Sequence, residues 1–253
     1  WYAYHSMSTF SSSSPKGLSE LYKNLGMKSS MNSYNGLGAT QLVYALFGVQ
    51  YFYSKYSDYE DPFMTKYEEN ESYTIYKLKD ALPIAYSIPE IFAKEVFVSK
   101  TTIAGSLDYQ NDIFKKLTGI DDLYTSVDTI KYEKTKTVTA GQTGHYYMTV
   151  TGNAPEDLNL TKENDTFTKT FSGLNKHNHI VDLGYLKEGE SINIDAELEM
   201  TAEIFVMDYN KLSEGISKLN NNSISLSNYT DTSIEGDINA SGGSVLFTFA
   251  YDP

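Results

Sequence analysis

The spacing of hydrophobic and polar positions changes once along the chain, near residue 124. Before it, apolar residues recur at helical spacing in three stretches, which predicts helices over 15–25, 40–47 and 106–118. Alternating or β-branched and aromatic segments between them predict strands over 49–53, 73–78 and 84–88. After it, alternating segments separated by turn sequences such as AGQTG, SGLN and LKEGES predict strands over 129–139, 145–151, 166–171, 179–183, 192–200, 201–207, 223–227, 233–238 and 245–251.

These patterns predict an α+β chain in two parts. Residues 1–124 are expected to form a mixed α/β subdomain, and residues 125–253 an antiparallel, jelly-roll-like β-sandwich. One helix interrupts the second part at about 208–220, where Asp208 precedes apolar residues at helical spacing. The acidic stretch 54–72, SKYSDYEDPFMTKYEENES, is interpreted as an exposed connection.

The stretch from Tyr22 to Tyr53 contains the most distinctive loop of the sequence. Gly26 is expected to end the first helix in the left-handed conformation, and Gly48 to end the second. The loop SSMNSYNGLG between these helices is rich in Ser, Asn and Gly, which favour turns and outward-facing polar groups. A polar loop held between two apolar helices is the first place to look for function.

Composition excludes several classes of function. The net charge is −13 and all 20 basic residues are Lys, so nucleic-acid binding is disfavoured both by sign and by the lack of Arg. The absence of Cys excludes disulfides, thiol catalysis and Cys-ligated zinc. The 22 Tyr against 12 Phe are explained mainly by strand packing, although exposed Tyr also suits stacking on sugar rings. No run reaches the ~18 apolar residues of a membrane span, and the chain is expected to be a piece of a longer protein.

Motifs for catalysis and metal binding are weak. His177 and His179 would share a face on a strand and could join a metal site, but two surface histidines explain them better. Acidic runs lack the glycine-punctuated spacing of a calcium loop, and no G-x-S-x-G or S-x-x-K motif is present. Two carboxylates that meet in space for glycosidase chemistry stay possible, but the sequence singles out none. We therefore expect no cofactor, no metal and no catalysis by this chain alone.

Three groups of motifs follow one another along the chain. The first is STFSSS with LYKNLGMKSSMNSYNG and LVYALFGVQYFY. The second is ALPIAYSIPE with YQNDIFKKLTGIDDLY, and the third is VMDYNKLSEGISKL with SIEGDINASGGSVLFTFAYDP. In this order and spacing they resemble the extracytoplasmic C-terminal region of the YfhO-like family of bacterial multi-spanning membrane proteins. The resemblance covers nearly the whole chain.

The resemblance implies a lipid-phosphosugar-dependent glycosyltransferase that modifies teichoic-acid-type cell-wall polymers. The chain would be its accessory domain on the extracellular face of the membrane, with the catalytic acid in membrane-proximal loops elsewhere. The expected partners are a cell-wall glycopolymer or lipid-linked sugar, and the membrane through further segments. Two other classes stay open: a free-standing carbohydrate-binding or adhesion module, and a structural scaffold for membrane helices. The residues expected to contact the acceptor are His5, Ser8, Asn32, Ser33, Tyr34 and Asn35.

Overall fold

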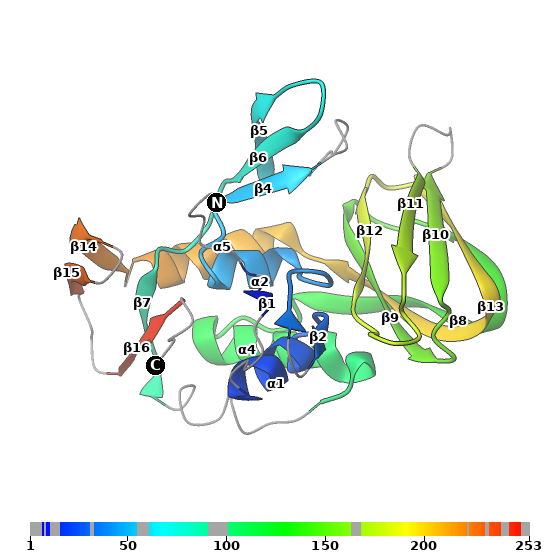
Figure 1. Ribbon diagram of the computed structural model, residues 1–253, viewed down its shortest axis with the longest axis horizontal. Coiled ribbons are helices and arrows are strands. Elements are labelled where there is room, and N and C mark those ends of the chain that lie inside the picture. The colour runs from blue at the N-terminus through cyan, green and yellow to red at the C-terminus, as the bar shows by residue number, and fades with distance from the viewer. Residues whose placement is uncertain are drawn as a thin grey trace. The chain divides into compact units, whose positions relative to one another are not determined.

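The computed structural model describes residues 7, 9–10, 16–30, 33–54, 61–90, 101–162, 168–221, 223–230, 233–238 and 243–248 (Figure 1). Its helices are α1 (Lys16–Asn24), α2 (Gln41–Leu46), the 3-10 helix η1 (Ile103–Gly105), α4 (Ser106–Thr118) and α5 (Tyr209–Asn220). Its strands are β1 (Thr9–Phe10), β2 (Ser29–Ser30), β3 (Ser33–Tyr34), β4 (Tyr51–Ser54), β5 (Met64–Glu69), β6 (Thr74–Leu78), β7 (Ala85–Ile88), β8 (Tyr124–Thr139), β9 (Gly144–Gly152), β10 (Asp157–Lys162), β11 (Thr168–Ser172), β12 (Val181–Leu186), β13 (Ser191–Met207), β14 (Ile224–Tyr229), β15 (Ile234–Ile238) and β16 (Ser244–Phe247).

The chain divides into two compact units, each assembled from three stretches of sequence. The first unit comprises residues 1–40, 100–111 and 122–209. The second unit comprises residues 41–99, 112–121 and 210–253. The strand β8 begins at Tyr124, where the change of period places the start of the sandwich. The division into subdomains 1–124 and 125–253 stays a prediction.

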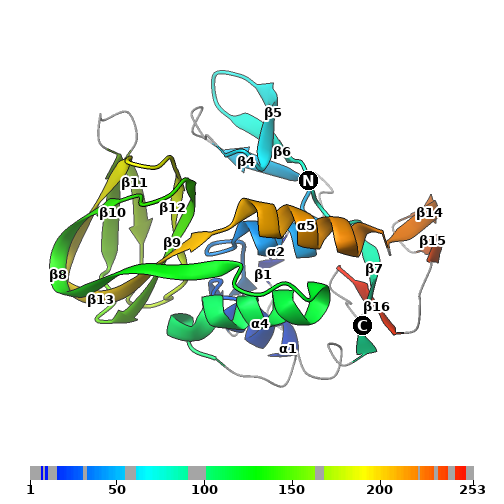
Figure 2. The same cartoon turned by 180° about the vertical axis from the view of Figure 1, so that it is seen from behind.

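The first unit contains a six-stranded antiparallel sheet that curls on itself. Its strand order is β11-β10-β13-β9-β12, and β8 pairs with the other edge of β13 along most of its length, as Figure 2 shows. The first part of β13 lies between β8 and β10, and its second part lies between β8 and β9. The ladder to β8 changes register between Asp195 and Met200, and such an irregularity bends a strand. The bend gives a sandwich-like arrangement, which confirms the predicted fold class.

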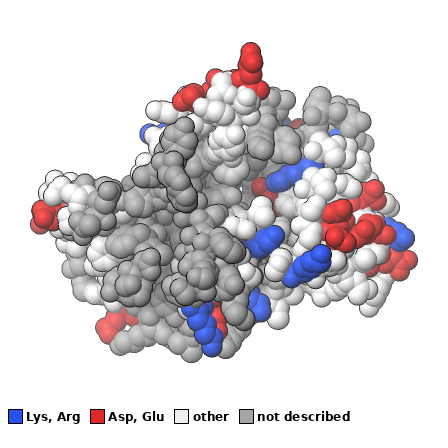
Figure 3. All heavy atoms as spheres, in the orientation of Figure 1, with Lys and Arg blue, Asp and Glu red and all other residues white. Residues whose placement is uncertain are grey.

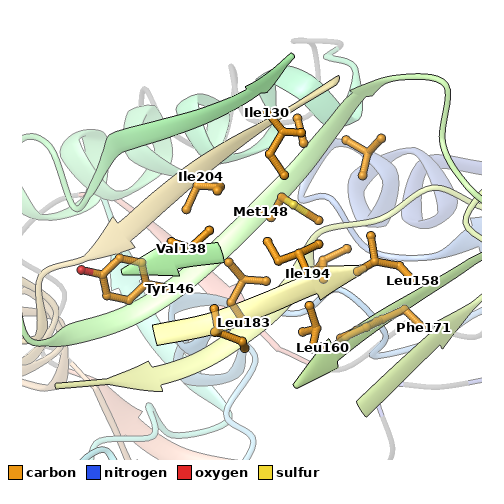
Figure 4. Packing of buried hydrophobic residues seen from close by; sticks show 14 of the residues in the cluster. Ile130, Val138, Tyr146, Met148, Leu158, Leu160, Phe171, Leu183, Ile194 and Ile204 are labelled. Atoms are coloured by element: carbon orange, nitrogen blue, oxygen red, sulfur yellow. The ribbon is translucent and has the colours of Figure 1, made fainter. Parts of the chain in front are cut away.

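Alternate residues of these strands fill one core. Each strand contributes every second position because side chains alternate between the faces of a sheet. Figure 4 shows aliphatic side chains from both parts of the sheet pointing toward one another, Ile130 and Met148 among them. Full burial of such a side chain is worth roughly 1.5–3 kcal/mol, so this core dominates the stability of the first unit. Its labelled members are Ile130, Val138, Tyr146, Met148, Leu158, Leu160, Phe171, Leu183, Ile194 and Ile204.

The opposite face of β9 is also covered within the first unit. His145, Tyr147 and Thr149 point away from the core and are nevertheless buried. The short helix η1 lies against β9. A strand buried on both faces is apolar or aromatic at nearly every position, and the sequence GHYYMTV of β9 has that character.

Helix α1 ends in the way that its sequence predicts. Gly26 has a φ of 80°, which a residue with a side chain rarely adopts. Its N–H donates to the Lys23 carbonyl at 3.0 Å, and the Met27 N–H donates to the Tyr22 carbonyl at 2.9 Å. This pair of bonds is the Schellman arrangement, which satisfies two carbonyls at the helix end. The prediction that Gly26 closes the helix is confirmed.

The second unit combines short sheets with helices. Its three-stranded sheet has the order β4-β6-β5, and the pairs β7 with β16 and β14 with β15 are two-stranded. A Cβ added at Gly215 of α5 would lie 2.3 Å from the Phe114 ring of α4, so the two helices approach closely. The buried Tyr86 hydroxyl donates to the Leu46 carbonyl at 3.0 Å, and burial raises the pKa of Tyr86.

Three secondary-structure predictions are wrong in detail. The expected connection 54–72 contains β5, because Phe63 and Met64 are buried at its start and it pairs with β6. The expected strands 192–200 and 201–207 form one strand, β13, which carries a bend at their junction. The strand β10 lies at Asp157–Lys162, where the sequence pattern predicts no strand.

Candidate functional site

The polar loop after Gly26 forms a small antiparallel sheet. The strands β2 and β3 pair as a hairpin, with Ser29 opposite Tyr34 and Ser30 opposite Ser33. The strand β1 pairs with the other edge of β3, which places Thr9 opposite Tyr34. The backbone that directly follows Ser8 therefore lies beside the loop. We call residues 28–37 the loop hairpin.

Backbone hydrogen bonds close the base of the loop hairpin. The Lys28 N–H donates to the Leu37 carbonyl at 2.8 Å, and the Asn35 N–H donates to the Lys28 carbonyl at 3.2 Å. The Asn35 side-chain oxygen accepts from the Leu37 N–H at 3.0 Å, which is an Asx turn. Asn35 is half-buried, and its side chain takes part in this turn.

A chain of buried polar groups fixes the two ends of this loop. The Gln110 amide donates to the Leu25 carbonyl at 2.7 Å and accepts from the Thr40 hydroxyl at 2.7 Å. The Tyr124 hydroxyl donates to Thr40 Oγ1 at 2.9 Å. Gln110 and Thr40 are fully buried, and buried polar groups need such partners. The bonds hold Leu25 and Thr40, which flank the loop hairpin, against α4 and β8.

Two glycines bring the loop against the segment that leads into β12. The Ile180 N–H donates to the Gly26 carbonyl at 2.8 Å. A Cβ at Gly26 would lie 2.4 Å from Ile180 Cδ1, and one at Gly38 would lie 2.5 Å from the Gly26 carbonyl oxygen. The backbones approach so closely that no side chain fits between them. Both ends of the loop hairpin are thus held by buried hydrogen bonds and close backbone contacts.

The structure describes two of the six predicted contact residues in full. Ser33 and Asn35 are half-buried in the loop hairpin, and the Ser33 and Ser30 hydroxyls are 2.8 Å apart. Both residues bond locally, as expected if the loop orders itself. Of Tyr34 the backbone alone is described, in β3. His5, Ser8 and Asn32 lie outside the described residues. Their role in contacting an acceptor stays a prediction.

His177 and His179 do not form a shared site. His177 is exposed, whereas His179 is buried and its Nδ1 lies 2.8 Å from the Ile180 carbonyl oxygen. Burial is the main cause that lowers the pKa of His179, and the bond to Ile180 opposes it. Among the described residues no group of three or more His, Cys, Asp or Glu could hold a metal ion.

A buried polar cluster on the first unit's sheet was not predicted from the sequence. His145 of β9 is buried, and its Nε2 lies 2.6 Å from Asp182 Oδ1 of β12. The Tyr209 hydroxyl lies 3.4 Å from the other ring nitrogen, and Lys169 Nζ lies 3.7 Å from Asp182 Oδ2. The Gly184 N–H donates to Asp182 Oδ1 at 2.8 Å, at a bulge in β12. The carboxylate is thus held from several sides.

These contacts set the charge state of Asp182. Burial by itself would raise the pKa of this carboxyl group, since its side chain is only 22% exposed. The nearby His145 and Lys169, together with the hydrogen bonds from His145 and Gly184, outweigh burial and hold the pKa well below its usual range. The cluster therefore keeps a charged carboxylate within the sheet. His145 and Asp182 lie on strands that the sequence predicts, but only the pairing of β9 with β12 brings them together.

The comparisons with known proteins identify the family. The chain has an α+β fold, with a curled antiparallel sheet and a polar loop that forms a hairpin. Its whole length, residues 1–253, matches the family described as bacterial membrane protein YfhO, and the chain belongs to that family. Neither the comparison with curated proteins nor that with solved structures gives a match. None of the helices within the described ranges has the length and apolar character needed to cross a bilayer.

Proposed function

We propose that this chain is the extracytoplasmic accessory domain of a membrane glycosyltransferase that modifies cell-wall glycopolymers of the teichoic-acid type. In this proposal the domain positions the acceptor polymer and is catalytically inert alone. Membership of a family of bacterial membrane proteins supports a role at the membrane. The partners are the glycopolymer or a lipid-linked sugar, together with the membrane segments of the longer protein.

The observation that carries the proposal is the support of the loop hairpin. Its two flanks are tied by the buried bonds of Gln110 and Thr40, and its base is closed by Lys28 and Leu37. A loop held in one conformation loses little entropy when a flexible polymer binds to it. The hydroxyl and amide groups of such a loop suit the hydroxyl groups of sugars.

The strand pairing adds a second support. Because β1 pairs with β3, Thr9 and Phe10 lie beside the loop hairpin in the first unit. Of the proposed contact residues, His5 and Ser8 precede β1 in the sequence and Tyr34 lies in β3. Acceptor residues that come from separate stretches of sequence can contact a polymer together only when such a pairing brings the stretches side by side.

The test is a substitution in the full-length protein. Tyr34→Ala removes the ring proposed to cover an apolar sugar face. We expect the sugar content of the isolated cell-wall polymer to fall in cells that depend on this variant. We expect the free energy of unfolding of the 253-residue chain to change by no more than about 1 kcal/mol, as for a surface substitution.

Tyr132→Ala is the matched control, because Tyr132 of β8 is 72% exposed and lies outside the loop hairpin. This variant should leave polymer glycosylation unchanged. If Tyr34→Ala unfolds the chain, or leaves glycosylation intact while the fold is preserved, the loop hairpin serves architecture alone and the proposed acceptor site is wrong.

A further inference from the structure

The three-stranded sheet of the second unit has one covered and one open face. The covered face carries Met64, Tyr76 and Leu78, which are all buried. The open face carries tyrosines: Tyr51 is 47% exposed, Tyr53 is 54% exposed and Tyr67 is 60% exposed. An exposed group of large aromatic side chains on one face is unusual for a soluble surface and marks a contact site.

The tyrosine rings of the open face are ordered in two pairs. The rings of Tyr51 and Tyr67 meet edge to face with their centroids 5.1 Å apart. The rings of Tyr53 and Tyr73 are also 5.1 Å apart, at an angle of 36°. Tyr51 and Tyr53 are two residues apart on β4, so the two pairs are offset by about 7 Å along the strand. We call Tyr51, Tyr53, Tyr67 and Tyr73 the tyrosine face.

A hydrogen-bonded turn and a β-bulge position two residues of the tyrosine face. The Asn70 side-chain oxygen accepts from the Ser72 N–H at 2.8 Å and from the Tyr73 N–H at 3.1 Å. These bonds set the turn that leads Tyr73 into β6. The register between β5 and β6 shifts between Lys66 and Glu68, which makes Tyr67 the extra residue of a bulge. Bulges re-aim side chains, and here the bulged residue joins the ring of Tyr51.

Charge narrows the class of ligand. Lys77 Nζ lies 5.9 Å from the centre of the Tyr51 ring, and Glu68 lies on β5 beside the bulge. One cation and one anion make the face nearly neutral. Figure 3 shows acidic side chains at the tip of the β5–β6 hairpin, where Glu69 and Glu71 are exposed, and the chain carries −13 overall. A polyanion would be repelled by these charges, whereas a neutral ligand would not.

The chemistry of the tyrosine side chain restricts the class of ligand further. A tyrosine has a flat apolar ring and a polar tip, so it can contact a ligand that is apolar on one side and hydrogen-bonding at its edge. A pyranose ring has that character, with C–H groups on its faces and hydroxyls around its rim. The tyrosine hydroxyls, the Lys77 ammonium group and the Glu68 carboxylate are the hydrogen-bond donors and acceptors available to that rim. A lipid or an apolar protein surface would be matched better by aliphatic side chains, whereas the large exposed side chains here are tyrosines.

We propose that the tyrosine face binds a neutral glycan chain, with successive pyranose rings stacked on the two tyrosine pairs. The proposal rests on the proposed function only for the source of the glycan, which would be the sugar-bearing part of the acceptor polymer. The binding itself follows from the tyrosine face alone. The charged polymer backbone is excluded as the bound segment.

The 253-residue chain tests the binding directly. We expect cellohexaose, a neutral chain of pyranose rings, to bind in isothermal titration calorimetry, and polyglycerol phosphate to give no heat. The double variant Tyr51→Ala, Tyr53→Ala removes one ring from each pair and should weaken cellohexaose binding at least about tenfold, which corresponds to about 1.4 kcal/mol. Tyr132→Ala removes a more exposed tyrosine outside the tyrosine face and should bind as the unsubstituted chain does. Circular dichroism checks that both variants are folded.

Several results would overturn the proposal. These are the absence of cellohexaose binding, an equal loss of affinity in the double variant and in Tyr132→Ala, or binding of polyglycerol phosphate that is stronger than that of cellohexaose. Self-association of the chain that is abolished by the double variant would assign the tyrosine face to a second copy instead. The two proposals can fail separately. If Tyr34→Ala lowers polymer glycosylation but cellohexaose does not bind, the loop hairpin remains the acceptor site and the tyrosine face is not a glycan site. If cellohexaose binds but Tyr34→Ala leaves glycosylation intact, the tyrosine face binds glycan and the loop hairpin is not the acceptor site.

Discussion

Two strands with similar tyrosine-rich sequences differ completely in exposure. In β9, within the sequence HYYM, Tyr146 and Tyr147 are almost fully buried. In β4, with the sequence YFYS, Tyr51 and Tyr53 are about half exposed. Because both sequences are rich in tyrosine, the cause of this difference lies in the elements that pack against each strand.

The neighbours of β9 cover both of its faces, and those of β4 cover one. β9 lies between β13 and β12, with the sheet core on one side and η1 on the other. β4 is an edge strand of three, and its tyrosines alternate with Phe52 and Ser54 on the covered side. Buried tyrosines need internal partners for their hydroxyls, whereas exposed ones keep theirs in water. The comparison therefore separates tyrosines that stabilise the fold from tyrosines available for contact.

The largest effect is expected at Tyr146, in the core of the first unit. Its hydroxyl donates to the Gln142 carbonyl at 2.7 Å. Tyr146→Ala should lower the free energy of unfolding by about 3–5 kcal/mol, because the ring leaves a cavity. Tyr146→Phe keeps the ring and should cost only about 1 kcal/mol for the lost hydrogen bond. Chemical denaturation of both variants separates the two contributions, and similar losses in both would contradict the assignment of the ring to the core.

An intermediate effect is expected at Asp182, which shares the first unit's sheet with Tyr146. Asp182→Asn removes the charge that faces His145 and Lys169. The free energy of unfolding should fall by about 1–3 kcal/mol at neutral pH, because the partners lose a charged acceptor. Asp195→Asn, at an exposed position of β13, is the control and should have little effect.

The effect of Asp182→Asn should depend on pH. The folded state holds the pKa of Asp182 below that of the unfolded chain, which is roughly 4. The charged carboxylate therefore stabilises the fold above roughly pH 4, and this stability is lost as the pH falls through the folded pKa. Denaturation curves between neutral and acidic pH should show the difference between Asp182→Asn and the unsubstituted chain shrinking under acid. A constant difference would show that packing, and not charge, is responsible.

The helix ends were predictable because they depend on local chemistry. Gly26, Gly48 and Gly119 each follow a helix and each have a positive φ, as glycine allows and other residues resist. The strand β5 was not predictable in the same way. Its residues after Met64 are exposed, so it lacks the alternation of a half-buried strand, and only its pairing with β6 defines it.

The candidate sites were predictable to different extents. The Ser, Asn and Gly content of the loop hairpin indicated a turn that presents polar groups. Its supports could not be foreseen, because Gln110 and Tyr124 lie 70 and 84 residues beyond Thr40 in the sequence. The tyrosine face was not predictable for a similar reason. Tyr67 lies in the stretch interpreted as a connection, Tyr73 begins the strand predicted over 73–78, and they meet Tyr51 and Tyr53 only through the pairing of the sheet.

The smallest effect on stability is expected at the tyrosine face. Tyr53 is exposed and its ring centroid lies 5.1 Å from that of Tyr73, so Tyr53→Ala should change the free energy of unfolding by no more than about 1 kcal/mol. Tyr53→Phe should change it less, because the ring pair is retained. Both values follow from the position of Tyr53 at an open face, where truncation leaves no buried cavity. Chemical denaturation of these two variants beside Tyr146→Ala and Tyr146→Phe measures the comparison directly. If Tyr53→Ala proves as costly as Tyr146→Ala, the tyrosines of β4 stabilise the fold as those of β9 do, and their exposure gives no reason to assign them a ligand.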